Sequence, residues 1–318
     1  MSDGPFVSFA QNAEDVVLWR ALQHVSEGHY VEVGANHPRT DSVTRAFYDR
    51  GWNGITIEPV EEFAALHREQ RPRDVQLRVA ISDGESANVT LHAVAGTGLS
   101  STVDAVGERH RITGRKVEDI VVPARTLEQV YSDAGWADRP VHFMVIDVEG
   151  AEAAVIRGLD LRRHRPWVLV VEATQPNSTV ATHGEWEPAI LAAGYEFCLF
   201  DGLSRFYVAQ EHGEELAARL AYPACVLDDF VPARFDDELK RLSQQLDSTT
   251  SELEAQVIHW KRIALTEWAD AVSPMRRSEV ADPDADRLRE ELAAMHGSLS
   301  WRVTEPIRGL RRAIGRIR

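Results

Sequence analysis

Two nearly continuous apolar runs constrain the fold of this chain more than any other feature. They are residues 141–148 (VHFMVIDV) and 167–173 (WVLVVEA). Short apolar runs without alternation are typical of strands that are buried on both faces of a parallel sheet. The two runs therefore predict the centre of an α/β protein.

Other strand-like segments alternate with helical ones along the first 210 residues. Residues 195–200 and 205–209 flank an Asp-Gly turn, which predicts an antiparallel hairpin. The remaining expected strands are 29–34, 54–58, 75–82 and 120–123, and the expected helices are 11–25, 41–50, 60–70, 126–134, 151–159 and 186–193. This order predicts a doubly wound, mostly parallel α/β sheet that ends in an antiparallel pair.

The pattern changes after residue 233, so residues 1–233 are expected to form the globular domain. Residues 234–269 carry a heptad seam, 270–286 have the composition of a linker, and 287–318 predict a basic helical tail. The seam predicts a coiled-coil-like segment that forms a homo-oligomer through 235–265. Its members are Leu239, Leu242, Leu246, Thr249, Leu253, Gln256, Trp260 and Ile263.

Charge is unevenly distributed. The chain has 35 Lys and Arg against 50 Asp and Glu, and residues 1–233 carry the whole excess of 15 negative charges. Nucleic acids require clustered cations, so we expect no nucleic-acid partner. The last 18 residues hold six Arg and one Glu among apolar residues, which predicts peripheral contact of 301–318 with an anionic membrane. The alternative is a solvated basic end that packs on the acidic globule.

The cellular compartment follows from what the sequence lacks. The two cysteines, Cys198 and Cys225, form no CxxC pair, and the N-terminus has no basic start followed by an apolar run. No apolar stretch approaches the ~18 residues that cross a bilayer. We therefore expect a cytoplasmic protein that contacts the inner face of the membrane.

A nucleoside-binding pattern spans the first two expected strands. Gly34 ends the first of them, and Glu58 ends the second, 26 residues after Glu32. A glycine at this turn lets a ligand approach the backbone, and an acid after the second strand accepts hydrogen bonds from ribose hydroxyls. A single glycine favours S-adenosylmethionine over a dinucleotide. The alternative is a turn glycine beside a solvated acid.

The chain resembles the FkbM-type methyltransferases over roughly residues 6–232. This resemblance implies a seven-stranded, Rossmann-like sheet of the class I methyltransferases, S-adenosylmethionine as cofactor, and methylation of a hydroxyl group. It rests on seven separated segments in the order of the family: 8–18 (SFAQNAEDVVL), 30–59, 79–83 (VAISD), 98–102 (GLSST), 122–130 (VPARTLEQV), 145–161 (VIDVEGAEAAVIRGLDL) and 194–208.

The resemblance also implies site residues. Glu32, Gly34 and Asn36 match the family's first motif, at the methionine end of the cofactor, and Glu58 matches its ribose-binding acid. Gln11 lies where similar proteins cover the cofactor. The adenine-contacting turn corresponds to Ile81, Ser82 and Asp83, and the I-D-x-E-G-x-E signature supplies Asp147, Glu149 and Glu152. His37-Pro38 departs from the family at the first turn.

The candidate catalytic residues are Asp147, Glu149, Glu172 and His183. Asp147 follows a central strand, at the edge of the sheet where ligands bind in α/β proteins. It orients or deprotonates the acceptor, or it caps the next helix. Glu172 ends the neighbouring strand and positions the acceptor or bonds to backbone. His183 is a general base or a solvated loop residue.

A metal ion is not expected. Asp147, Glu149 and Glu172 offer the oxygen ligands that Mg²⁺ prefers, but nothing in their spacing demands an ion.

The acceptor is expected to be a saccharide hydroxyl of a cell-surface glycan or glycolipid. Residues 298–312 resemble a segment that often ends bacterial surface-polysaccharide glycosyltransferases and their partner enzymes. Two alternatives stay open: a polyketide or other secondary metabolite as acceptor, and a non-catalytic scaffold in a glycan-assembly complex.

Overall fold

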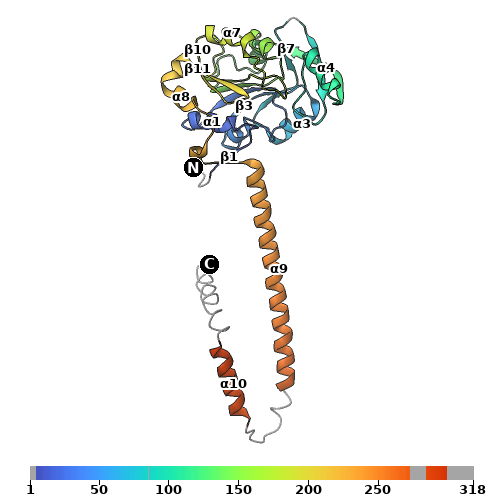
Figure 1. Cartoon of the computed structure of the whole chain (residues 1–318), viewed down its shortest axis with the longest axis vertical. Coiled ribbons are helices and arrows are strands. Elements are labelled where there is room, and N and C mark those ends of the chain that lie inside the picture. The colour runs from blue at the N-terminus through green and yellow to red at the C-terminus, as the bar shows by residue number, and fades with distance from the viewer. Residues whose placement is uncertain (1–4, 85, 273–283, 299–318) are drawn as a thin grey trace. The chain divides into compact units, whose positions relative to one another are not determined.

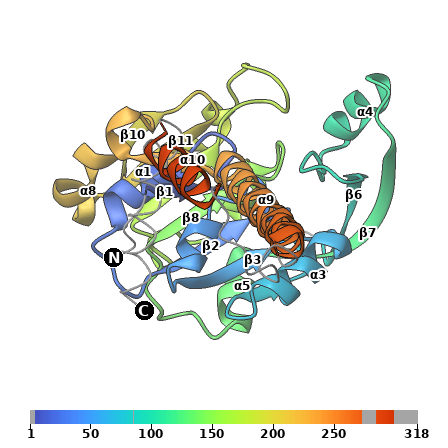
Figure 2. The ribbon, with the colours of Figure 1, turned by 90° about the horizontal axis from the view of Figure 1, so that it is seen from below.

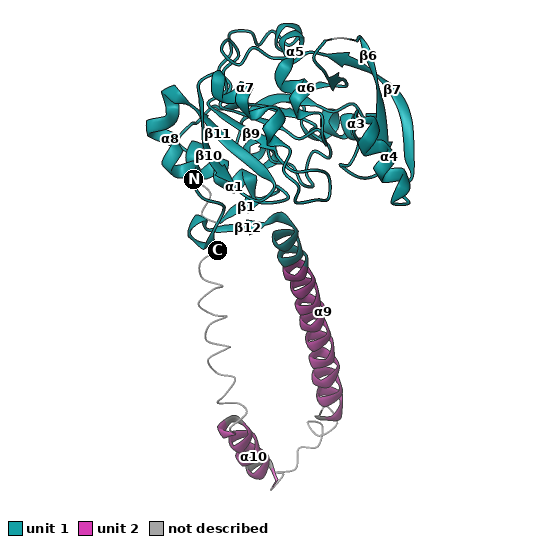
Figure 3. Cartoon of the chain, turned by 45° about the horizontal axis from the view of Figure 1, so that its top comes forward, with its two compact units in different colours: residues 1–241 teal, residues 242–318 magenta. Residues whose placement is uncertain are grey.

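The computed structural model describes residues 5–84, 86–272 and 284–298. The chain divides into two compact units, residues 1–241 and residues 242–318 (Figure 3). The predicted membrane-contacting segment 301–318 lies outside the described residues.

Within the described residues, the first unit contains a mixed sheet of seven strands in the order β10-β11-β9-β8-β2-β3-β4. Figure 1 labels β3, β10 and β11 of this sheet. The strands from β9 to β4 are parallel. The predicted hairpin is confirmed, because β11 pairs antiparallel with both β9 and β10. The bounds are β2 (His29–Val33), β3 (Asn53–Ile57), β4 (Val75–Leu77), β8 (Phe143–Ile146), β9 (Val168–Glu172), β10 (Tyr195–Phe200) and β11 (Ser204–Ala209).

Helices cover both faces of this sheet. Side chains alternate between the faces of a strand, so Phe143 of β8 packs with α1 and α2 while Met144 packs with α5 and α6. One face carries α1 (Glu14–Leu22), α2 (Arg45–Asp49) and α8 (Gly213–Leu220), and the other carries α5 (Leu127–Asp133), α6 (Glu152–Arg157) and α7 (Glu187–Ala192). Both faces of β8 and β9 are buried, as their apolar runs predicted.

A second sheet extends from the first. It contains β5 (Ala80–Ile81), β7 (Val117–Arg125) and β6 (Asn88–Val94), with α4 (Asp104–Ile112) beside β6 and β7 (Figure 2). The prediction of a single strand over 75–82 was wrong. The segment forms β4, which pairs with β3, and then β5, which pairs with β7, so the two halves belong to different sheets.

Smaller elements complete the unit. Helix α3 (Glu61–Gln70) connects β3 to β4, and β1 (Phe6–Ser8) pairs in parallel with β12 (Phe230–Pro232). The described residues of this unit also form three 3₁₀ turns, which are η1 (His183–Glu185), η2 (Gln210–His212) and η3 (Val226–Asp228).

The segment after β12 is helical. Helix α9 (Ala233–Val272) passes through the predicted segment 234–269, and α10 (Ala285–Gly297) follows the residues that are not described. None of the helices in the described ranges has the length and apolar character needed to span a bilayer.

Candidate active site

The carboxyl ends of β2, β3, β8 and β9 meet at one edge of the sheet. The turn after β2 is fixed by Gly34, whose φ of +82° suits glycine and whose N–H donates to the Ile57 carbonyl at 3.0 Å. A Cβ atom on Gly34 would lie 1.7 Å from the backbone oxygen of Asp147. The close approach of these two strand ends therefore requires glycine.

Glu58 ties the ends of β2 and β3 together. Its Oε2 accepts a hydrogen bond from the Asn36 N–H at 2.8 Å, and its Oε1 accepts one from the Val60 N–H at 2.7 Å. The side chain is buried, and burial raises its pKa to about 7. Each carboxylate oxygen retains a second lone pair for a ligand.

An apolar cavity opens beside Glu58. Gly34, Asn36 and Asp147 line it at the strand ends, and Ile81 lines it from β5. Ser82 and Asp83 are not among its lining residues, and Asp83 pairs with Arg157 at 3.1 Å. The wall is mainly apolar side chains together with residues of the 97–102 loop: Val33, Ile57, Val60, Phe63, Leu91, Thr97, Gly98, Ser100 and Thr102.

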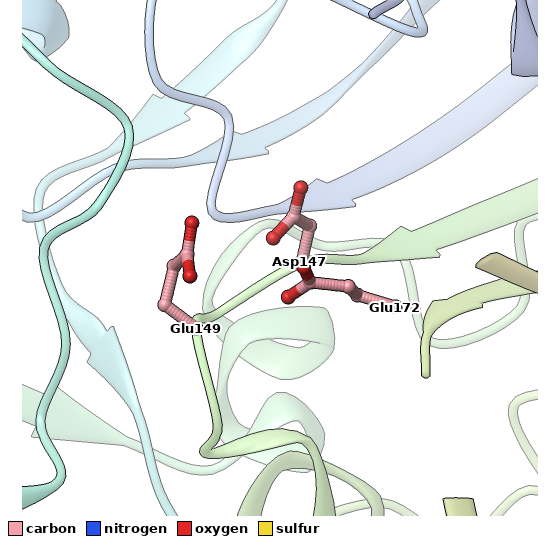
Figure 4. Close-up of side chains that lie close together, drawn as sticks. All are labelled: Asp147, Glu149 and Glu172. Carbon is pink, nitrogen blue, oxygen red and sulfur yellow. The ribbon is translucent and has the colours of Figure 1, made fainter. Parts of the chain in front are cut away.

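A second, acidic cavity of about 300 Å³ adjoins the first. Its floor holds the carboxyl groups of Asp147, Glu149 and Glu172, with one oxygen from each lying within 4.8 Å of the others (Figure 4). Burial and mutual repulsion raise the pKa of Glu149 and Glu172, and burial raises the pKa of Asp147. Among the described residues, no Lys, Arg or His lines this cavity.

Asp147 does not cap α6. The N-cap of that helix is Ala151 without a side-chain bond, and Glu152 accepts hydrogen bonds from the Gly150 N–H at 2.9 Å and the Val148 N–H at 3.3 Å. Glu152 therefore holds the loop, which leaves Asp147 available to the two cavities.

Glu32 lines the acidic cavity from β2 and has partners of its own. It accepts a hydrogen bond from the Thr44 hydroxyl at 2.6 Å, and a guanidinium nitrogen of Arg71 lies 3.8 Å away. Arg71 is fully buried and also bonds Asp74 at 2.8 Å and the Tyr30 hydroxyl. Sequence reasoning missed Arg71, because a lone Arg after a helix carries no signal for burial.

The other predicted residues are spread more widely. Gln11, just before α1, lines the acidic cavity, whereas His183 in η1 lines neither cavity. The Nε2 atom of His183 lies 3.8 Å from a Glu187 oxygen. Sequence reasoning also missed Asn177 and Ser178 of the acidic cavity, although they share a loop with His183.

The chain matches a known protein family. The family model described as the methyltransferase FkbM domain matches residues 32–197, more than half of the chain. A comparison with curated proteins finds no match.

Some solved structures are similar to this chain. One is a TehB-like SAM-dependent methyltransferase from Corynebacterium glutamicum, which is 6% identical in sequence and has a TM-score of 0.33. The match covers 61% of this chain and 87% of that chain. A CurJ carbon methyltransferase has 9% identity, with 63% and 56% covered and a TM-score of 0.36. An O-methyltransferase from Bacillus cereus in complex with SAH has 13% identity, with 61% and 78% covered and a TM-score of 0.30.

Proposed function

Because the chain belongs to the FkbM methyltransferase domain family, we propose that it is an enzyme that transfers a methyl group from S-adenosylmethionine to a hydroxyl oxygen. We also assign its sheet to the doubly wound, Rossmann-like class I type. The observation that carries the reaction is that Gly34, Asn36, Gly98 and Asp147 line both cavities. A donor in one cavity and an acceptor in the other would meet at these four residues.

The residues of the apolar cavity fit the chemistry of the cofactor. Glu58 offers carboxylate oxygens to ribose hydroxyls, and Phe63 and Ile81 offer apolar surface to a base. The acidic floor around Asp147 suits the positive charge of a sulfonium. S-adenosylmethionine supplies a methyl group on a positively charged sulfur, so transfer to a hydroxyl yields S-adenosylhomocysteine and releases one proton.

The protein's own task is to place the acceptor and to remove that proton. Asp147 lies at the boundary of the two cavities, where its carboxylate can hold the hydroxyl group and receive its proton. Glu172, beside it, would orient the acceptor. The pKa values of both carboxyl groups are raised by burial, which strengthens them as bases once they are ionised.

We favour a saccharide as acceptor. The acidic cavity is rich in hydrogen-bonding groups such as Asn177, Ser178 and Gln11, which match a polyol better than an apolar polyketide. Gln11 and Asp41 also line an open depression of about 560 Å³ beside β1 and β12. This continuity supports an acceptor longer than one sugar, and we place its methylation in the cytoplasm.

The test of this function begins with Glu58. We expect Glu58→Ala to weaken S-adenosylmethionine binding by roughly 10–150-fold, because hydrogen bonds to a charged group contribute about 1.5–3 kcal/mol. Isothermal titration calorimetry on the full chain measures this. Glu61→Ala is the matched control, since Glu61 lies nearby on α3 but outside the cavity. Equal affinity of Glu58→Ala and wild type would remove Glu58 from the site.

The same titration has a pH signature. Burial raises the pKa of Glu58 to about 7, so its carboxylate form increases as the pH rises through 7. Wild-type affinity should therefore rise between pH 6 and pH 8. Glu58→Gln cannot ionise and should lose that part of the pH dependence.

We also propose that α9 pairs with α9 of a second copy. Exposed apolar side chains recur at intervals of three, four, seven and eight residues, which keeps them near one face of α9. Two identical helices can pack such faces against each other. The apolar stripe passes through Val257 where the predicted seam has the polar Gln256. Its exposed members are Leu242, Leu246, Leu253, Val257, Trp260 and Trp268.

Light scattering on full-length protein tests this pairing. Wild type should have twice the mass of one chain. The double variant Leu246→Glu, Leu253→Glu should have the mass of one chain, because the introduced carboxylates would repel one another between the helices and would lose their hydration there. Gln244→Glu, an exposed polar position of α9, should leave the mass unchanged. A wild type with the mass of one chain would exclude the pairing.

A further inference from the structure

We propose that Asp147, Glu149 and Glu172 bind one hard divalent cation in the acidic cavity. Cation binding is a property of these side chains, and only the role of the ion in methyl transfer rests on the proposed function. The proposal replaces the expectation from sequence that no metal is bound.

The geometry of the three carboxyl groups suits such an ion. Their nearest oxygens all lie within 4.8 Å of one another, and they come from the ends of two adjacent strands (Figure 4). Oxygens bound to one ion at about 2.1–2.5 Å lie roughly 3–5 Å apart. The cluster therefore needs little movement to coordinate a Mg²⁺, Mn²⁺ or Ca²⁺ ion.

Two buried oxygens in the cluster lack a partner. Glu172 is only 7% exposed, and its Oε2 receives no hydrogen bond from any described residue. The Oε2 of Glu149 is likewise buried and has no donor in the part of the chain that the structure describes. A carboxylate oxygen removed from water without a hydrogen-bond donor is costly, so both oxygens favour a cation at this position.

Other buried acids of this unit have hydrogen-bond or ionic partners. Glu58 and Glu152 each accept two backbone hydrogen bonds, and Glu32 has Thr44 and Arg71. A proton shared between Asp147 and Glu172 would relieve that pair alone. The Glu149 oxygen would remain without a partner, whereas a cation satisfies all three groups.

The surroundings leave room for the rest of a coordination sphere. Thr174 and Asn177, whose side chains carry neutral oxygens, line the same cavity, which is large enough for water or an acceptor hydroxyl. A hydroxyl bound to the ion has a lowered pKa and loses its proton at neutral pH more readily. On the proposed function, the cation would hold the acceptor oxygen next to Asp147.

Titration of the full-length protein with Mn²⁺ tests the site without an acceptor. Electron paramagnetic resonance counts free Mn²⁺, and we expect one bound ion per chain that Mg²⁺ or Ca²⁺ displaces. Glu149→Gln and Glu172→Gln keep the side-chain shape but remove one charge, so each should weaken binding by about tenfold or more. Asp41→Asn, in the same cavity but outside the cluster, should change affinity less than about twofold.

Thermal unfolding identifies any variant that fails to fold. If Glu149→Gln or Glu172→Gln fails to fold, Asp147→Asn is measured in its place. The cation site would be overturned if no Mn²⁺ binds at millimolar concentration. It would also be overturned if Mn²⁺ affinity stays the same in every variant of the cluster. S-adenosylmethionine affinity is measured on the same samples. Intact, Glu58-dependent affinity without Mn²⁺ binding refutes the cation alone, whereas absence of that affinity counts against the proposed function.

Discussion

Gly34→Ala should destabilise the first unit by about 3 kcal/mol or more and abolish S-adenosylmethionine binding. The φ of +82° alone costs an L-residue about 1–2 kcal/mol. The added Cβ would also lie 1.7 Å from the Asp147 backbone oxygen, so β2 and β8 must separate where the two cavities meet. The melting temperature of a unit of this size should fall by roughly 6–12 °C.

Gly51→Ala provides the matched control. Gly51 has a φ of +95°, but no described residue other than its chain neighbours lies within 4 Å of the position that a Cβ atom would take. This variant therefore incurs the conformational cost alone, about 1–2 kcal/mol or roughly 2–8 °C. Calorimetric melting of both variants separates close approach from backbone conformation, and equal melting temperatures would show that the strand ends tolerate a methyl group.

The sequence predicted the centre of the sheet because burial there is complete. Residues 141–148 and 167–173 have apolar side chains on both faces. A short run of this kind is typical of a strand that is buried on both faces of a sheet. The observed strands are shorter than these runs, because β8 covers Phe143–Ile146 and β9 covers Val168–Glu172. Strand ends depend on pairing partners, which a single sequence does not display.

The second sheet shows where pattern alone failed. Residues 75–82 look like one strand, yet the chain changes sheets between Leu77 and Ala80. Strand β7 is nine residues long although only 120–123 was predicted, because Glu118 and Asp119 interrupt its apolar pattern. Both errors arise where tertiary pairing, not local hydrophobicity, decides the structure.

The candidate site was predictable in part for a geometric reason. Parallel strands end at a common edge, so Gly34, Glu58, Asp147 and Glu172 were expected together, and the structure places them there. Loop residues have no such anchor: Asn177 and Ser178 line the acidic cavity, whereas His183 of the same loop lines neither cavity. The Glu149 Oε2 atom lacks a hydrogen-bond donor because of the side chains that surround it in the folded protein. A sequence pattern does not specify those surroundings.

Asp147→Asn should reduce kcat by about 10²–10⁴ while S-adenosylmethionine affinity changes far less. The substitution keeps the shape of the side chain but removes the charge that would receive or polarise the hydroxyl proton. Transfer of labelled methyl from S-adenosylmethionine to a panel of saccharides measures it. Asp133→Asn, on the exposed end of α5, is the control for loss of one surface charge.

The same assay separates three accounts of the reaction. If Asp147 acts as the base without an ion, chelation should leave wild-type turnover intact. If the carboxyl groups hold a cation, chelation and Asp147→Asn should each cause the loss, and added Mn²⁺ should restore only the chelated wild type. If His183→Ala alone is inactive, the base lies on the loop between β9 and α7, and that loop must move to bring His183 to the acidic cavity.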